Sequence, residues 1–415
     1  EPARTPRIRR RLALVLILLL GMILSGHGRL AAAAEPDRAV LATIPAKMLE
    51  FVEDGQIAGA VTVVGRHDGI VSYEAVGWRD LETRQPMTKE TVFRIASMTK
   101  PITAIGVMIL VDEGKLAVED EVEKHLPAFR GQMLLASRTP ELVTLKRPSR
   151  KITIRDLLTH TSGLPGGMPP GLSDLYVRRN HTLAEVVMAV SQRPLNFEPG
   201  SKWAYCNAGM GVLGRVIEVA SGQRYEEFLK KRIFEPLGMK DTAFYPSPEQ
   251  LRRKAQTYGI KEGKLVAVPD TIIGPTQGAV YPIPAGGLHS TGADLARLYE
   301  MMLCRGSCQG KRILSENAVG RMTSLQTGEL KVGFVAEMGF GLGWGVVRQP
   351  AGVTAMLSPG TFGHGGAFGT QGWIDPKRDL FMVLLIQRVG LLGGDASDMR
   401  RVLQAVAVSA LKSGK

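Results

Sequence analysis

Strand patterns lie near both ends of this chain, and this placement restricts the fold more than any other feature. Residues 60–79 alternate as two strands joined by a tight turn, and residues 372–387 repeat that hairpin pattern near the C-terminus. An amphipathic helical pattern follows over residues 395–411. We therefore predict an α/β (α+β) fold in which both ends of the chain build one antiparallel sheet flanked by helices.

The middle of the chain carries mainly helical patterns. With 415 residues, 44% hydrophobic, the chain suffices for one large domain or two closely joined lobes. We predict a single domain over 35–415, with a sheet lobe formed by about 38–114 and 255–415 and an all-helical region inserted at about 115–254. Residues 130–151 show no clear periodicity, so we expect an insertion or an exposed loop there.

Residues 1–34 have the pattern of a secretory signal peptide. A cluster of arginines precedes the apolar run 12–24, and the alanines at 31–34 offer a small-residue cleavage site. The run is shorter than the ~20 residues that a membrane span needs. We predict cleavage near Ala34, a secreted or periplasmic location and no membrane span afterwards; a permanent N-terminal anchor is the alternative.

The charge pattern and the cysteines indicate which kinds of partner and site are expected. The formal net charge is +13, but the basic residues are scattered and no aromatic side chains alternate with them, so we expect no nucleic-acid partner. An exported protein can hold disulfides. Cys304 and Cys308 could bridge if a helix ends near Gly306, or remain reduced, while Cys206 is expected to be a buried thiol. No Cys/His spacing predicts a metal site.

Ser97 and Lys100 form a Ser-x-x-Lys pattern at the start of the apolar run 101–111. If a helix begins there, the two residues are i and i+3 and share one face. A buried lysine with a lowered pKa can take the serine proton, and the free N–H groups of a helix N-terminus suit a developing oxyanion. The alternative is that Ser97 only caps the helix.

Two further patterns could supply a site. Tyr205 and Asn207 lie at i and i+2 of an extended segment, so a phenol and an amide share one side. His364 precedes Gly365 and Gly366, where glycines allow the backbone to approach a ligand. Each of these residues could equally well be packing or structural. The chain lacks a Gly-x-Ser-x-Gly elbow, a His-Glu-x-x-His pattern and a P-loop, which argues against those three chemistries.

Taken together, these patterns resemble the serine β-lactamase and penicillin-binding-protein-like superfamily, in particular the class C β-lactamase-related hydrolases and esterases. The resemblance covers about residues 40–410. It rests on five motifs in order: Ser97-Met-Thr-Lys100, Leu157-Leu-Thr-His-Thr-Ser-Gly-Leu164, Tyr205-Cys-Asn207, Pro284-Ala-Gly-Gly-Leu-His-Ser-Thr291 and His364-Gly-Gly366.

The resemblance implies a β-lactamase/transpeptidase-like fold and an acyl-enzyme mechanism without metal or cofactor. Ser97 would be acylated, Lys100 and Tyr205 would share the proton transfers, and Asn207 would orient the substrate. The oxyanion hole would be the backbone N–H groups of Ser97 and of Ala367, the latter on an edge strand. Which of Lys100 and Tyr205 is the base stays open.

One departure from the family bears on the substrate. The family's Lys-Thr-Gly is His364-Gly365-Gly366 here, and a histidine is mostly neutral at pH 7, which weakens the case for penicillin hydrolysis. We predict an exported serine hydrolase that acts on a small-molecule ester, amide or peptide, preferably an ester. The alternatives are a β-lactamase, a D-aminopeptidase or D,D-carboxypeptidase on cell-wall peptides, and a non-catalytic penicillin-binding-like protein.

Overall fold

The computed structural model describes residues 35–167, 178–269, 274, 277–333, 335–391 and 393–412, and is built on one eight-stranded antiparallel sheet. The predicted signal peptide lies outside the described residues. The strands, in the order in which they lie side by side, are β12 (Met338–Phe340), β13 (Gly345–Val347), β14 (Phe362–Gly365), β15 (Gln371–Asp375), β16 (Leu380–Leu385), β1 (Gly59–Arg66), β2 (Gly69–Asp80) and β3 (Gln85–Pro86).

Both ends of the chain build this sheet, as predicted. Strand β1 pairs with β2 on one side and with β16 on the other, so Val63 lies opposite both Tyr73 and Val383. Side chains alternate between the two faces: Val61 and Val63 join the larger core, while Ala60 and Val64 join the smaller one. The predicted α/β (α+β) class is confirmed.

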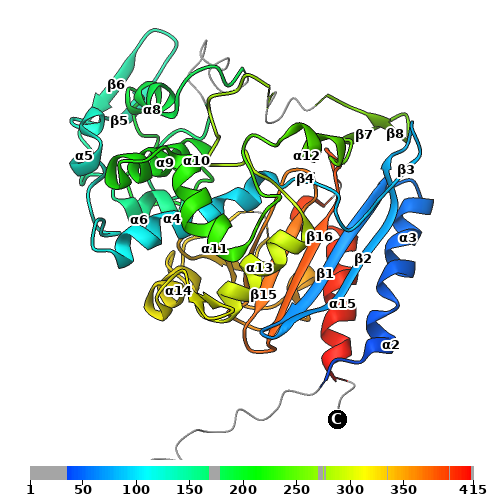
Figure 1. Ribbon diagram of the computed structural model, residues 1–415. Coiled ribbons are helices and arrows are strands. Elements are labelled where there is room, and N and C mark those ends of the chain that lie inside the picture. Colours follow the sequence, from blue (N-terminus) through cyan, green and yellow to red (C-terminus); the bar gives the residue numbers. More distant parts are fainter. Residues whose placement is uncertain are drawn as a thin grey trace, which may run out of the picture.

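Helices cover both faces of the sheet (Figure 1). Helices α2 (Arg38–Leu41), α3 (Ile44–Glu53) and α15 (Asp398–Lys412) lie on one face, and α13 (Gly292–Leu303) lies on the other. Helices α2 and α3 are separated by a turn at residues 42–43. Pro45 explains the break, because it sits in the first turn of α3 and has no N–H to continue the hydrogen bonding of α2.

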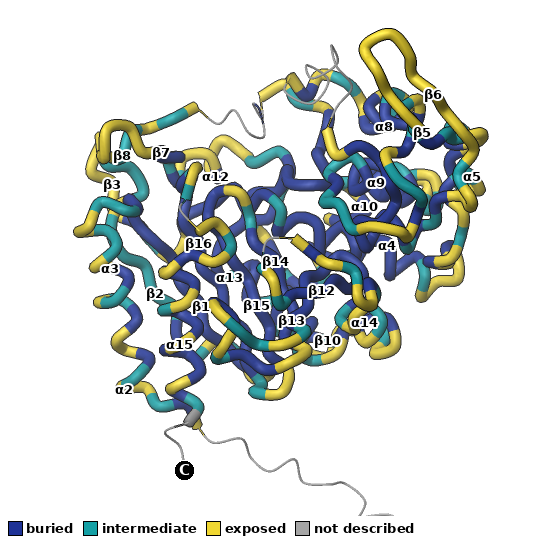
Figure 2. Tube along the Cα trace, turned by 180° about the vertical axis from the view of Figure 1, so that it is seen from behind, coloured by how far each residue is buried: buried dark blue, intermediate teal, exposed yellow. Residues whose placement is uncertain are grey.

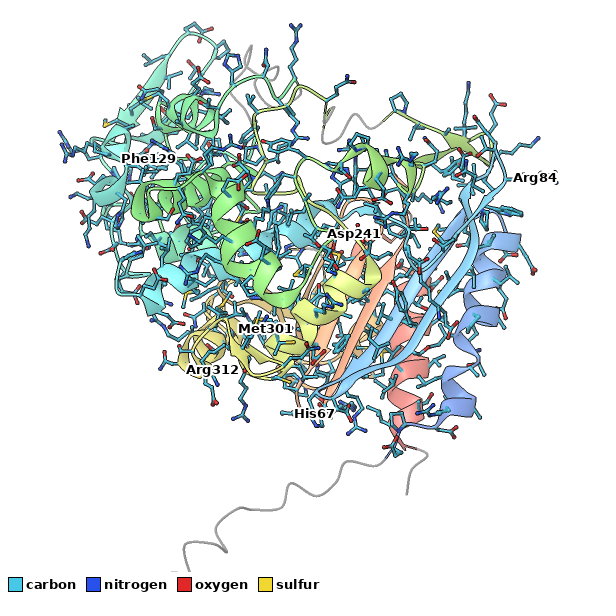
Figure 3. All side chains as sticks on the ribbon, viewed as in Figure 1. His67, Arg84, Phe129, Asp241, Met301 and Arg312 are labelled. Atoms are coloured by element: carbon cyan, nitrogen blue, oxygen red, sulfur yellow. The ribbon has the colours of Figure 1, made fainter. Side chains whose placement is uncertain are left out.

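The inserted region is helical apart from one hairpin. Phe129, in this region, and Arg84, between β2 and β3, lie at opposite sides of the molecule (Figure 3). The elements of the inserted region are α5 (Val122–His125), the hairpin β5 (Leu134–Arg138) and β6 (Val143–Lys146), α6 (Ile154–Leu158), α8 (Leu183–Ser191), α9 (Asn207–Ser221), α10 (Tyr225–Leu229), a π-helical turn at 230–234, α11 (Glu235–Leu237) and α12 (Pro248–Arg252). Residues 136–147 are exposed, as Figure 2 shows, so the stretch without periodicity is an exposed hairpin.

Helix α4 (Thr99–Asp112) joins the two regions. Its side chains are buried from Thr99 to Leu110, and it packs against α9. A helix that is apolar on all sides is stable only when it is enclosed. The remaining short elements are β4 (Phe93–Arg94), β7 (Tyr258–Lys261), β8 (Lys264–Ala267), β9 (His289–Ser290), β10 (Ser307–Cys308), β11 (Lys311–Arg312) and α14 (Glu316–Thr323).

All three cysteines are free thiols, so the Cys304–Cys308 disulfide does not form in this structure. Helix α13 ends at Leu303, and the chain turns into β10, which places the two sulfurs on different partners. Cys304 Sγ lies 3.5 Å from the carbonyl oxygen of His67, whereas Cys308 Sγ lies 3.7 Å from Glu300 Oε1. Within the described segments, no helix is long and apolar enough to cross a membrane.

Candidate active site

Ser97 lies in a sharp turn that connects β4 to α4. A single 3₁₀ turn over Ala96–Met98 precedes the helix, and Ala96 has φ +45°, which is uncommon for a residue with a Cβ. The backbone N–H of Ile95 donates to Leu288 O at 3.1 Å and anchors the start of this turn. Ser97 is partly exposed while the residues on either side of it are buried. The turn therefore presents the hydroxyl at the N-terminus of a buried helix.

Lys100 lies beside this hydroxyl. Its Nζ is 3.0 Å from Ser97 Oγ and 2.7 Å from the carbonyl oxygen of Ala285. The side chain is fully buried, and burial lowers the pKa of Lys100 to about 7. A substantial fraction is therefore neutral near pH 7 and can accept the Ser97 proton. The i, i+3 spacing brings the two groups together, as predicted.

The Tyr205-Cys206-Asn207 segment faces Lys100 from the start of α9. Lys100 Nζ lies 4.6 Å from the centre of the Tyr205 ring, and Asn207 is the first residue of the helix. Cys206 points away: its sulfur accepts from Gly209 N at 3.2 Å and lies 3.4 Å from Leu164 O. Burial raises the pKa of this thiol to about 11, so it stays protonated. Tyr205 and Asn207 are both partly exposed and remain available to a substrate.

His364 approaches from β14, with its ring centre 6.2 Å from that of Tyr205. Its Nδ1 lies 2.6 Å from Gly365 O. Burial, with the nearby Lys100 charge, lowers the pKa of His364 to about 4. The imidazole is therefore neutral at pH 7, and it does not replace the positive charge of the family's lysine.

Gly366 begins the turn that carries Ala367 toward Ser97. A Cβ on Gly366 would come within 2.4 Å of Ile95 O, and Thr370 Oγ1 donates to the same carbonyl at 3.2 Å. The turn over 366–370 is thus held directly against the backbone that precedes Ser97. The joint oxyanion role of the Ser97 and Ala367 N–H groups stays a prediction.

The expectation that Ala367 lies on an edge strand is wrong. Ala367 lies in the turn after β14, and β14 is an interior strand because β12 and β13 extend the sheet beyond it. Pairing with β13 ends at Gly363. His364 and Gly365 therefore have β15 as their strand partner on one side and no paired strand on the other among the described residues.

His160 joins the site, although the sequence assigned it no role. It lies in the turn after α6 with φ +60° and is 1% exposed. The N–H of Cys206 donates to His160 Nδ1 at 3.3 Å, and the ring centre lies 4.8 Å from that of Tyr205 and 5.0 Å from that of Phe340. Burial and the Lys100 charge hold the pKa of His160 well below its usual value. The motif 157–164 contains His160, but no pattern in the neighbouring sequence predicts its contact with Tyr205.

Two hollows of the described surface lie away from Ser97, Lys100 and Tyr205. One of about 370 Å³ is lined by residues such as Phe129 and Arg147 of the helical region, and Ser97, Lys100 and Tyr205 take no part in it. Within the described part of the chain, no group of three or more His, Cys, Asp or Glu side chains is arranged to hold a metal ion. The candidate site is therefore defined by the side chains around Ser97.

Comparison with known proteins places this site in context. The sequence model of the family described as Beta-lactamase matches residues 44–407. Protein Rv1367c of Mycobacterium tuberculosis is 34% identical over 372 residues, which cover 85% of this chain and 91% of that protein. Esterase EstB of Burkholderia gladioli is 31% identical over 368 residues, covering 81% and 87%. The solved structure of EstCE1, described as a hydrolase with promiscuous acyltransferase activity, aligns with a TM-score of 0.73 at 25% identity, covering 90% of this chain and 99% of that chain.

Proposed function

Because the chain belongs to the beta-lactamase family of serine hydrolases, we propose that it hydrolyses carboxylic esters through an acyl-enzyme on Ser97. The observation that carries the proposal is the 3.0 Å contact between Ser97 Oγ and Lys100 Nζ. Serine is a weak nucleophile until a base is within hydrogen-bond reach, and the lowered pKa of about 7 makes Lys100 such a base.

The reaction proceeds in two halves. Lys100 takes the proton as Ser97 Oγ bonds to the ester carbonyl carbon, and the carbonyl oxygen becomes an oxyanion held by the N–H groups of Ser97 and Ala367. Collapse of this intermediate breaks the ester C–O bond, and the alcohol leaves with a proton from Lys100, directly or through the Tyr205 hydroxyl. Water then attacks the acyl-enzyme with Lys100 or Tyr205 as base, which releases the acid and restores Ser97.

The charge of the site favours a neutral acyl donor. Penicillins and C-terminal peptides carry a carboxylate, and the family's lysine helps to bind it. Here His364 is neutral at pH 7, since burial and Lys100 lower its pKa to about 4. An uncharged ester does not need that cation, and the similarity to esterase EstB supports the same choice.

Transfer of the acyl group to an alcohol is the second candidate. It is favoured by the similarity to EstCE1, whose description includes promiscuous acyltransferase activity. The acyl-enzyme is common to both reactions, and only the acceptor differs. Formation of a new ester from vinyl butyrate and a primary alcohol, at the expense of butyric acid, would identify this activity.

We also propose that the protein is exported, on the strength of the signal-peptide pattern in residues 1–34. Expression of the full chain in a bacterial host, followed by N-terminal sequencing of the extracellular and periplasmic fractions, tests this proposal. A mature N-terminus near Glu35 is expected, and full-length protein confined to the cytoplasm would contradict it.

A substrate panel tests the catalytic proposal. We expect p-nitrophenyl butyrate to be turned over faster than nitrocefin or a D-alanyl p-nitroanilide, and a fluorophosphonate to add once to the protein. Ser97→Ala should abolish both turnover and the adduct, whereas Ser201→Ala, an exposed serine in the loop before Tyr205, should leave both intact. Turnover of nitrocefin or the anilide well above the ester would refute the ester preference, and an adduct that persists in Ser97→Ala would refute the nucleophile.

A further inference from the structure

We propose that the β5–β6 hairpin docks this protein on an anionic membrane surface. The hairpin, with its following residue, spans 134–147 and is called the finger below. It projects from the helical region, away from the central sheet (Figures 1 and 2). Leu134 anchors the base of the finger in the larger core, whereas every residue from Ala136 to Arg147 is exposed.

The exposed side chains of the finger include three large apolar ones. Leu142 at the tip is 63% exposed, a larger fraction than for any other large apolar side chain of the described residues, and Val143 and Leu145 are 47% and 42% exposed. Val143 and Leu145 are two apart on one strand and therefore share a face. Leu145 lies opposite Leu135 in the register, which extends this face toward the base. Apolar clusters of this kind mark interaction sites on soluble proteins.

Cations flank the apolar face. Arg138 lies opposite Val143 in the register, and Lys146 and Arg147 follow at the base. Lys146 contacts Glu198 at 3.3 Å, whereas Arg138 and Arg147 have no ion pair among the described residues. The finger has a single acid, Glu141. Basic side chains beside exposed apolar ones are the combination that binds the headgroup region of anionic bilayers.

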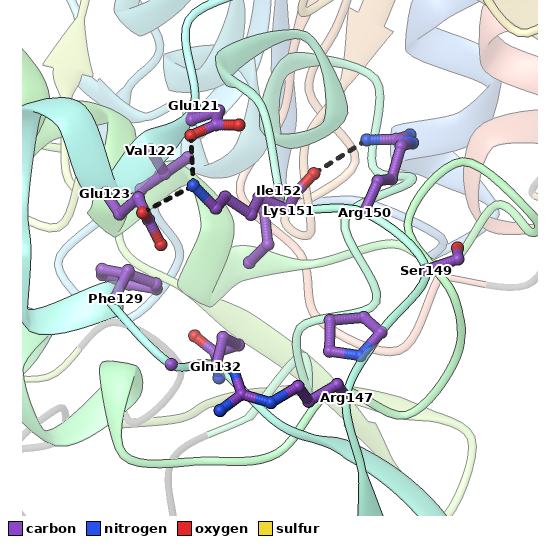
Figure 4. Close-up of a pocket in the computed structure, with 12 residues that line it drawn as sticks. Glu121, Val122, Glu123, Phe129, Gln132, Arg147, Ser149, Arg150, Lys151 and Ile152 are labelled. Atoms are coloured by element: carbon purple, nitrogen blue, oxygen red, sulfur yellow. Dashed lines mark hydrogen bonds and ion pairs between the residues drawn. The ribbon is translucent and has the colours of Figure 1, made fainter.

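The base of the finger holds ion pairs that are internal to the protein. Arg147 lines the hollow of about 370 Å³, across which Lys151 lies 2.8 Å from Glu121 and 2.9 Å from Glu123 (Figure 4). That ammonium is already neutralised within the protein. Within the finger, the cations without an ion pair among the described residues are Arg138 and Arg147.

The charge and shape favour a membrane over a protein partner. Two copies meeting through their fingers would bring Arg138, Lys146 and Arg147 of each close together, and like charges oppose such contacts. A stable protein interface buries about 800 Å² on each partner, which a narrow two-stranded finger offers poorly. Insertion of apolar side chains by about 5–10 Å into the headgroup region needs only such a projection.

Vesicle flotation tests the proposal. We would use the full chain and also the chain from Glu35, in which the apolar run 12–24 cannot contribute. Binding to phosphatidylglycerol vesicles, weak binding to phosphatidylcholine vesicles, and loss of binding at high salt are expected. Leu142→Ser/Val143→Ser/Leu145→Ser should weaken binding at least about tenfold, and Arg138→Gln/Arg147→Gln roughly fivefold per cation.

A second hairpin supplies the matched control. Ile260→Ser/Lys261→Gln/Lys264→Gln alters the exposed β7–β8 hairpin in the same way and should leave vesicle binding unchanged. Ester hydrolysis and thermal unfolding should match the parent in every variant, since no substitution touches the site. The proposal fails if the chain from Glu35 does not bind anionic vesicles at low salt, or if binding is equal in the finger variants and the control. It also fails if the parent forms a dimer that the finger variants abolish and the parent does not bind vesicles.

Discussion

Lys100 is the residue on which the proposed chemistry most depends. It is fully buried, yet its hydrogen-bond partners are a hydroxyl and a carbonyl oxygen, and no carboxylate of the described residues pairs with it. Burial without a counter-charge lowers a lysine pKa, which turns an ordinary cation into a base that works near pH 7. Burial, together with the same charge, lowers the pKa values of His160 and His364, so Lys100 is the group of the three that titrates nearest neutrality.

Ester hydrolysis should therefore rise with pH and level off above about 7. The pKa of Lys100 is lowered to about 7, so its neutral, proton-accepting form is lost as the pH falls below that value. The profile of kcat/KM from pH 5 to 9 measures this limb. Lys100→Arg keeps a proton throughout this range and should lower kcat by about a thousandfold. The surface exchange Lys115→Arg is the control, and a profile that is flat or falls with pH would contradict the role of Lys100.

His160 is expected to act as a positioning residue for Tyr205 and Asn207. It accepts from the N–H of Cys206, which lies between them, and its ring packs on Tyr205. His160→Leu removes the acceptor and should cost about 1–3 kcal/mol of unfolding free energy and about ten- to a hundredfold in kcat/KM. His160→Asn keeps an acceptor and tolerates positive φ, so it should retain most of the activity.

Kinetics separate this role from simple destabilisation. Both variants are compared at a temperature where circular dichroism shows full folding. The midpoint of the acid limb of the pH profile should stay near pH 7 because Lys100 is untouched. Equal activity of His160→Leu and the parent under those conditions would show that the histidine only fills space.

The β14–β15 hairpin is the element that brings His364 beside Tyr205 in the candidate site. Gly365 stands where the family has threonine, and a Cβ there would come within 1.8 Å of Asp395 Oδ1 and 2.6 Å of Gln371 Nε2. Asp395 in turn accepts from Gln371 at 2.8 Å. The side chains behind the strand thus occupy the space of the missing one, so a larger residue at position 365 has to displace them.

Restoring the threonine at position 365 should therefore destabilise the protein unless Asp395 is also changed. Gly365→Thr alone should lower the free energy of unfolding by about 1–3 kcal/mol through overpacking. In Gly365→Thr/Asp395→Ala the clash is relieved, so the loss should be smaller than the sum of the single losses by about 0.5–3 kcal/mol. Urea unfolding of the four proteins gives this coupling directly, and strictly additive losses would mean that Asp395 does not exclude the side chain.

In the molecule as a whole, the two ends of the chain close one face of the sheet. Asp37 N donates to Ala410 O at 2.9 Å, and α15 packs on α2, α3 and β16. Its buried side chains, among them Leu403 and Val406, complete the smaller core on the face opposite α13. This core lies apart from the side chains around Ser97, so its packing should govern stability more than chemistry.

Leu403→Ala should consequently destabilise the protein without impairing the site. Truncating a fully buried leucine leaves a cavity and costs about 2–5 kcal/mol, which thermal or urea unfolding measures. Arg401→Ala, on the exposed side of the same helix, should change stability by no more than about 0.5 kcal/mol. Values of kcat/KM at 25 °C should match the parent for both; a large loss of activity in folded Leu403→Ala would show that the two faces of the sheet are coupled.

The sequence alone determined the features that depend on neighbouring residues. Hairpins at both ends followed from alternation and turns. Thr153 and Thr182 each precede an acidic residue by three positions, and both form capping boxes at the starts of α6 and α8. Ser97 and Lys100 had to meet once a helix began there, because i and i+3 share a face. Such features need no knowledge of how distant segments pack.

Only the tertiary structure decided the properties that arise between distant segments. The low pKa of Lys100 comes from enclosure by other elements, and His160 meets Tyr205 across a gap in sequence that no local pattern spans. The interior position of β14 was likewise not predicted. The state of Cys304 and Cys308 was left open, as was the choice between an insertion and an exposed loop where the finger lies. The reason is physical: each depends on a sum of weak non-local contacts, whereas backbone periodicity specifies only the local ones.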